Sequence, residues 1–188
     1  HLSPDVFANS FEQALKFMKA AGQQYAVFPW LAPEQRVSID QYKQYAETLN
    51  RCGEMAREEG ITVAYHNHEF EFEMLDGELP MDVILNETDP DLVKIELDLY
   101  WVHYANIDPY EFLKKNSGRV ELWHVKDMDD SPERKFTEVG NGIIDYATLF
   151  EQRKLSGLKH YFIEQDQSDN PLKSLEISFK NLTQNILA

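Results

Sequence analysis

The chain has 188 residues, 43% hydrophobic and 12% aromatic, which is enough to bury a substantial core as one domain, residues 1–188. Thirty-three acidic against eighteen basic residues give a formal charge of −15, and such a surface repels nucleic acids and anionic membranes. No apolar run approaches the roughly 20 residues that cross a bilayer, and the single cysteine, Cys52, excludes an internal disulfide. We therefore expect a soluble, cytoplasmic protein.

Helices and strands alternate along the predicted chain. Ser3-Pro4-Asp5 is typical of a helix start, with Ser3 as the N-cap, and apolar residues at helical spacing continue to Gly22. Further helices are predicted over residues 38–60, 80–87, 108–118, 145–155 and 171–187. Strands are predicted over residues 24–30, from 61 into the segment 64–73, and over 92–101, 120–127 and 159–166, with a polar loop over 128–142.

This alternation indicates βαβ units with a parallel sheet, either an open doubly wound sheet or a (β/α)₈ barrel. Polar residues at the carboxyl ends of four different strands favour the barrel, which builds active sites there. A whole barrel takes about 250 residues, so we expect an α/β (β/α)₈ TIM barrel of which only the C-terminal five strands are present. The three front strands would be lost or supplied by another chain, and exposed sheet edges would favour a homo-oligomer.

Four residues at those strand ends form a candidate metal site. They are His66, Asp98, His124 and Glu164. Two imidazoles and two carboxylates suit Mn²⁺, Co²⁺, Zn²⁺ or Fe²⁺ better than Ca²⁺. Each has an alternative role taken singly: a buried histidine, a helix cap for Asp98, or a lysine partner for Glu164. Their recurrence at equivalent points of four strands favours a metal.

Other residues on these faces are candidates for catalysis or substrate binding. His68 should point the same way as His66, because strand side chains alternate. Lys126 either holds a substrate anion or moves a proton with a lowered pKa, or it is a surface lysine paired with Asp127 or Asp129. The remaining candidates for substrate binding are Asp166, the loop amides of Gly140 and Gly142, and the aromatic faces of Trp30 and Trp101. An ordinary turn and core packing are the alternatives for the glycines and tryptophans.

Five segments together resemble the xylose isomerase-like TIM-barrel superfamily, which includes sugar phosphate isomerases/epimerases and inosose dehydratase-like proteins. They cover residues 65–72, 96–98, 123–127, 139–145 and 162–164, and the most specific begins His66-Asn67-His68-Glu69. The resemblance implies that His66, Asp98, His124 and Glu164 hold the metal, where ketose epimerases use Glu, Asp, His and Glu. Ketose epimerases use the first and last of these glutamates as a pair of bases, and His66 replaces the first of them. Trp101 stands where these epimerases often carry a histidine.

The resemblance implies a divalent-metal-dependent isomerase or epimerase that acts on a sugar, keto-sugar or cyclitol through an enediolate-like intermediate. Glu164, Lys126 or His68 would move the proton. The alternatives are a metal-dependent lyase or dehydratase of keto-sugars, or a sugar-binding barrel without turnover. Endonuclease IV relatives cleave phosphodiesters, but the charge of −15 argues against that activity.

Overall fold

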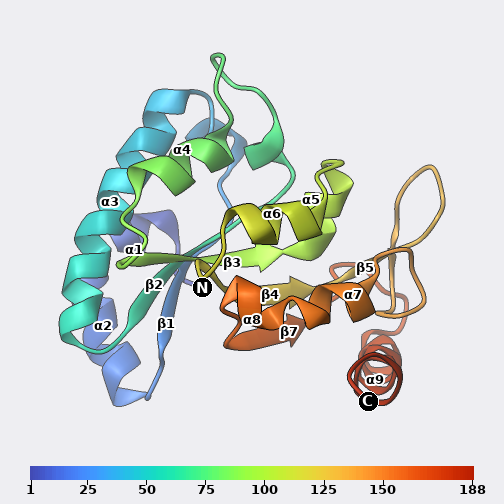
Figure 1. Cartoon of the computed structure of the whole chain (residues 1–188). Helices are drawn as coiled ribbons and strands as arrows, with labels where there is room; N and C mark the ends of the chain where they lie inside the picture. Colours follow the sequence, from blue (N-terminus) through green and yellow to red (C-terminus); the bar gives the residue numbers. More distant parts are fainter. The chain divides into compact units, whose positions relative to one another are not determined.

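The computed structural model describes residues 1–188, which divide into two compact units, His1–Glu96 and Leu97–Ala188. Strands and helices alternate throughout (Figure 1). None of the helices combines the length and the apolar composition that crossing a bilayer requires.

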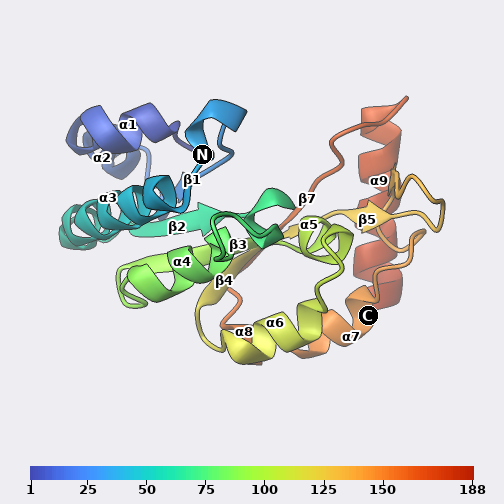
Figure 2. The same cartoon turned by 90° about the horizontal axis from the view of Figure 1, so that it is seen from above.

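The first unit is a three-stranded parallel sheet with helices. Its strands are β1 (Tyr25–Phe28), β2 (Thr62–His66) and β3 (Val93–Asp98), of which β3 continues two residues past the unit boundary. Its helices are α1 (Pro4–Asn9), α2 (Phe11–Ala20), α3 (Ile39–Glu58) and α4 (Pro80–Glu87), with short 3₁₀ turns at Pro33–Gln35 and Phe70–Phe72. Tyr25 pairs with Thr62, and Val63 pairs with Val93. Figures 1 and 2 show α3 and α4 side by side.

Local chemistry explains where these elements begin. The Ser3 hydroxyl accepts a hydrogen bond from Val6 N at 3.4 Å, and the Ser38 hydroxyl accepts one from Gln41 N at 3.4 Å. Both caps agree with the sequence pattern. The single helix expected up to Gly22 is instead two, because Ser10 leaves helical geometry at φ −143°.

The second unit contains two further parallel strands, β4 (Val120–Val125) and β7 (His160–Ile163), with Leu122 opposite His160. The short strands β5 (Asp127–Met128) and β6 (Phe136–Thr137) pair antiparallel, and all their residues except Asp127 lie in the segment 128–142 that was expected to be a loop. The helices are α5 (Leu99–Tyr104), α6 (Pro109–Lys115), α7 (Tyr146–Glu151), α8 (Arg153–Ser156) and α9 (Pro171–Asn181), which continues as a π-helical turn at Leu182–Ile186.

Five parallel strands that alternate with helices are part of a (β/α)₈ barrel, so the predicted fold class is confirmed. Apolar strand residues such as Val63, Ile95 and Leu122 are buried, as expected for strands covered on both faces. That the whole chain is one domain stays a prediction.

Candidate metal centre

Three of the predicted ligands come together in the second unit. Asp98 ends β3, His124 is the penultimate residue of β4, and Glu164 directly follows β7. One ligand atom of each residue lies within 4.8 Å of the other two. Asp98 and His124 are buried, whereas Glu164 is partly open to solvent. Three ligand atoms this close together could hold a divalent metal ion.

The two carboxylate oxygens of Asp98 have different partners, one in a helix cap and one in the cluster. Its Oδ1 accepts hydrogen bonds from Tyr100 N at 3.1 Å and Trp101 N at 3.2 Å, which caps α5. Its Oδ2 lies 3.0 Å from Lys126 Nζ. The capping role and the role in the cluster are therefore compatible.

Lys126 is buried at the centre of three carboxylates. Its Nζ lies 3.0 Å from Asp98 Oδ2, 3.0 Å from Glu164 Oε2 and 2.8 Å from Asp166 Oδ1. The alternative of a surface lysine paired with Asp127 or Asp129 is therefore wrong. Burial lowers the pKa of Lys126, but the surrounding carboxylates outweigh it and raise that pKa overall. A lysine with a lowered pKa was the wrong expectation, since the ammonium keeps its proton at neutral pH.

The cluster has more negative than positive charge. His124 Nδ1 lies 2.5 Å from Glu164 Oε2, and this hydrogen bond is the main reason that the pKa of Glu164 falls to about 2. Asp98, Glu164 and Asp166 are three carboxylates against the one ammonium of Lys126, which leaves two negative charges when His124 is neutral. A divalent cation would balance them, so the donor set fits a metal.

His66 contacts a buried glutamate in the first unit. Its Nδ1 lies 3.0 Å from Glu96 Oε2, and His1 Nε2 lies 2.6 Å from the same oxygen. One ligand atom from each of these three residues lies within 4.8 Å of the others. This largely buried His/Glu group could also bind a metal. Its glutamate was assigned no role from the sequence, although Glu96 stands two residues before Asp98 on the same strand.

The segment after His66 is not a strand, so the expected alternation of His66 and His68 is wrong. The β2 strand ends at His66, and the His68 backbone N–H donates to Glu71 Oε2 at 2.7 Å. Glu71 is fully buried and also accepts from Tyr65 Oη at 2.7 Å. His68 nevertheless stays near His66, with ring centroids 4.9 Å apart. The turn, rather than a strand, sets its position.

Backbone amides of the glycine loop are occupied by a side chain, so the expectation that they face a ligand is wrong. Gly140 N and Gly142 N donate to Asp127 Oδ2 at 2.8 and 3.1 Å. Asp127 Oδ1 accepts from Met128 N at 2.8 Å and from Ile144 N at 3.2 Å. Burial raises the pKa of Asp127, and these four bonds oppose that rise. Asp127 is thus the anchor of the loop.

The two candidate tryptophans occupy different units. Trp30 lies just after β1 in the first unit, with 48% of its surface exposed. Trp101 lies in α5 rather than on a strand, and its ring packs edge-on against Tyr104 and Phe136 at 5.5 and 5.8 Å. Packing within an aromatic cluster accounts for Trp101.

The model of the xylose isomerase-like TIM barrel family matches residues 5–181. The chain belongs to this family. Inosose dehydratase from Geobacillus thermodenitrificans is 27% identical over 137 residues, which are 64% of this chain and 45% of that protein. Inosose dehydratase from Clostridium perfringens is 27% identical over 154 residues, 71% of this chain and 51% of that protein. The chain therefore spans about half the length of these relatives.

Solved structures support the same assignment. A sugar phosphate isomerase/epimerase from Parabacteroides distasonis superposes with a TM-score of 0.84 at 26% identity, over 95% of this chain and 64% of that one. The IOLI protein, whose crystal structure contains a zinc atom, superposes with a TM-score of 0.74 at 20% identity, over 94% of this chain and 67% of that one. At this level of identity the second match shows a common fold.

Within this xylose isomerase-like chain, sequence reasoning missed three buried acids: Glu71, Glu96 and Asp127. Two signals were present. Glu96 lies two residues before Asp98, which in a strand places both side chains on the same face. Asp127 directly follows Lys126 in the segment 123–127. Glu71 had no such signal, because its partners depend on how the chain turns after β2.

Proposed function

We propose that the chain belongs to a divalent-metal-dependent enzyme that acts on a sugar, keto-sugar or cyclitol as an isomerase or epimerase. The observation that carries the proposal is the convergence of Asp98, His124 and Glu164 around a buried lysine. The named relatives, inosose dehydratases and a sugar phosphate isomerase/epimerase, support the substrate class.

Asp98, His124 and Glu164 would hold the metal, and the chemistry of these donors suits Mn²⁺, Co²⁺, Zn²⁺ or Fe²⁺. His66 is proposed as a further ligand from the sequence alone. When bound, the ion would act as a Lewis acid on a carbonyl oxygen and lower the barrier to removing the neighbouring proton.

Other functions, substrate binding and proton transfer, are proposed for individual side chains. Lys126 is an ammonium and donates hydrogen bonds, so it would hold a substrate oxygen that becomes negative during the reaction. Asp166, which lies 2.8 Å from Lys126 Nζ, would orient a substrate hydroxyl. The pKa of Glu164, lowered to about 2, keeps its carboxylate ionised, as a proton acceptor must be, although it also makes the carboxylate a weaker base; Glu164 would accept the substrate proton. His68 is the second candidate for proton transfer.

A dehydratase is the second candidate, and two observations favour it. The inosose dehydratases are 27% identical to this chain. His66, where ketose epimerases carry a glutamate, removes one of the two bases that a symmetric epimerisation uses. Both reactions begin with proton removal next to a carbonyl, and they differ in whether a hydroxyl leaves afterwards.

One assay distinguishes these outcomes. The purified protein would be incubated in deuterated water with Mn²⁺ or Co²⁺ and a panel of ketoses and inososes, and the products followed by NMR and mass spectrometry. An isomerase or epimerase returns an isomer that contains solvent deuterium. A dehydratase returns a product lighter by one water. Sugar binding with neither change would contradict an enzymatic function and leave a binding barrel.

A further inference from the structure

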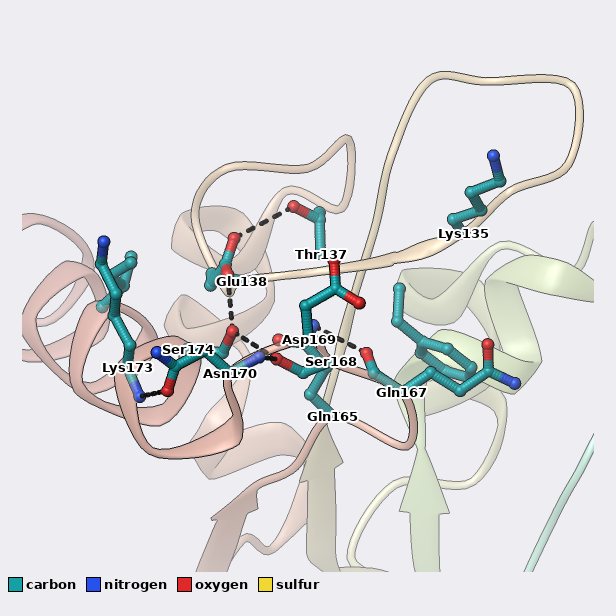
Figure 3. Close-up of a pocket in the computed structure, with 12 residues that line it drawn as sticks. Lys135, Thr137, Glu138, Gln165, Gln167, Ser168, Asp169, Asn170, Lys173 and Ser174 are labelled. Carbon is teal, nitrogen blue, oxygen red and sulfur yellow. Dashed lines mark hydrogen bonds between the residues drawn. The ribbon is translucent and has the colours of Figure 1, made fainter.

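A polar pocket lies in the second unit beside the loop that follows β7. Its volume is about 500 Å³, within the range of roughly 300–1,000 Å³ typical of small-molecule sites. Figure 3 shows its lining on three segments, around β6, after β7 and at the start of α9. Residues of the loop after β7 alternate between two sites. Glu164 and Asp166 contact Lys126 in the metal cluster, whereas Gln165 and Gln167 line the pocket.

The pocket presents hydrogen-bond acceptors. Gln165 Nε2 donates to the Gln167 carbonyl at 2.9 Å, which fixes the amide, and Gln165 Oε1 is buried without a hydrogen-bond partner. The Asp169 carboxylate also lines the pocket (Figure 3). A buried acceptor is stable only when a donor reaches it, which applies to Gln165 Oε1, while the exposed carboxylate of Asp169 is open to further hydrogen bonds; both groups suit a ligand that brings hydroxyl or amino donors.

Glu138, a second acid in the lining, already accepts a hydrogen bond from another residue of the protein. Its Oε1 accepts from Ser174 Oγ at 2.7 Å, and Ser174 Oγ lies 2.8 Å from Ser168 Oγ. The hydrogen bond from Ser174 is the main reason that the pKa of Glu138 is lowered. These contacts join the residue after β6 to α9, and all three residues line the pocket.

We propose that this pocket is a second binding site for a polyhydroxylated molecule of the sugar or cyclitol class. Asp169 would accept two neighbouring hydroxyls, Gln165 Oε1 a third, and the Phe136 ring in the lining would face the C–H groups of the ligand. An uncharged ligand is favoured because the lining is charge-balanced, with Lys135 and Lys173 against Glu138 and Asp169. The site is independent of the metal, and only its ligand class rests on the proposed function.

The test is calorimetric titration of myo-inositol into protein treated with EDTA, because the pocket contains no proposed metal ligand. We expect binding that survives metal removal and weakens about tenfold or more in Asp169→Asn and in Gln165→Met, since each loses an acceptor. Asp91→Asn, an exposed acid in the first unit, is the matched control and should bind like wild type. Circular dichroism of each variant confirms that it is folded.

Two outcomes would overturn the proposal. One is that folded Asp169→Asn and Gln165→Met bind myo-inositol as tightly as wild type. The other is that metal-free protein binds no polyol. If binding appears only after Mn²⁺ is added, the polyol is at the metal cluster, which contradicts the second site while it supports the proposed function.

Discussion

Lys126 Nζ lies 3.0 Å from Asp98 Oδ2, and both side chains are almost completely buried. A buried ion pair that loses one partner leaves an uncompensated charge, which costs about 3–5 kcal/mol. Lys126→Met should therefore lower the free energy of unfolding by about that amount in metal-free protein, as measured by urea denaturation. Lys114→Met is the control, because Lys114 is a solvent-exposed partner of Glu111 and its loss should cost about 0–1 kcal/mol.

The same Lys126→Met variant tests the charge balance of the cluster. Three carboxylates without an ammonium should attract a divalent cation more strongly, so Mn²⁺ should restore more stability to Lys126→Met than it adds to wild type. Urea denaturation with and without Mn²⁺ gives both values. Equal stabilisation of the two proteins would show that the ion does not bind at these carboxylates.

The glycine loop makes a prediction about packing. A Cβ on Gly142 would lie 2.3 Å from both Asp127 Oδ1 and the Met128 carbonyl oxygen. Gly142→Ala should cost about 1–3 kcal/mol or more, because the alanine displaces the anchor of the loop. Gly77→Ala is the control: no atom lies within 4 Å of its Cβ, and only its φ of +88° is strained. Thermal denaturation should show the larger loss for Gly142→Ala.

Buried Glu71 predicts a pH dependence of stability. Burial raises the pKa of its carboxyl from 4.5 to about 7, although the hydrogen bonds from Tyr65 and His68 oppose this rise. The folded state therefore binds the proton more tightly than the unfolded state. The resulting stability is fully present below about pH 4.5 and is lost as the pH rises through about 7.

Glu71→Gln keeps a neutral amide in place of the protonated acid, so it should not show this loss. Relative to the variant, wild type should lose roughly 3 kcal/mol between pH 4.5 and pH 8. Urea denaturation of both proteins across this range gives the difference. Parallel stability curves would show that Glu71 does not titrate in this range.

The sequence predicted the elements with the strongest local signals. The Ser3 and Ser38 caps, the helix Pro80–Glu87 and the five parallel strands all follow from spacing and capping residues. The convergence of Asp98, His124 and Glu164 also followed, because parallel strands bring their carboxyl ends to the same edge.

Tertiary contacts determined what the sequence could not show. The predicted strand 92–101 stops at Asp98, because that side chain caps a helix that contains Trp101; this cap is a local contact and was the alternative role that the sequence offered for Asp98. The amides of Gly140 and Gly142 are occupied because Asp127, which is distant in sequence, accepts their hydrogen bonds. The contacts of Asp127 with the two glycine amides have no period or motif of their own. The raised pKa of Lys126 likewise depends on three acids from two distant segments, Asp98 at the end of β3 and Glu164 and Asp166 after β7.

Asp98, His124 and Glu164 are proposed to hold a divalent metal. The most direct measurement is elemental analysis of purified protein after exposure to Mn²⁺, Co²⁺ and Zn²⁺ and removal of the excess, for wild type, His124→Ala and Glu164→Gln. The control is His160→Ala, an exposed histidine on β7. We predict about one ion per chain in wild type and His160→Ala, and a loss of about tenfold or more in affinity in the other two variants. Metal content unchanged in His124→Ala and Glu164→Gln would contradict the assignment.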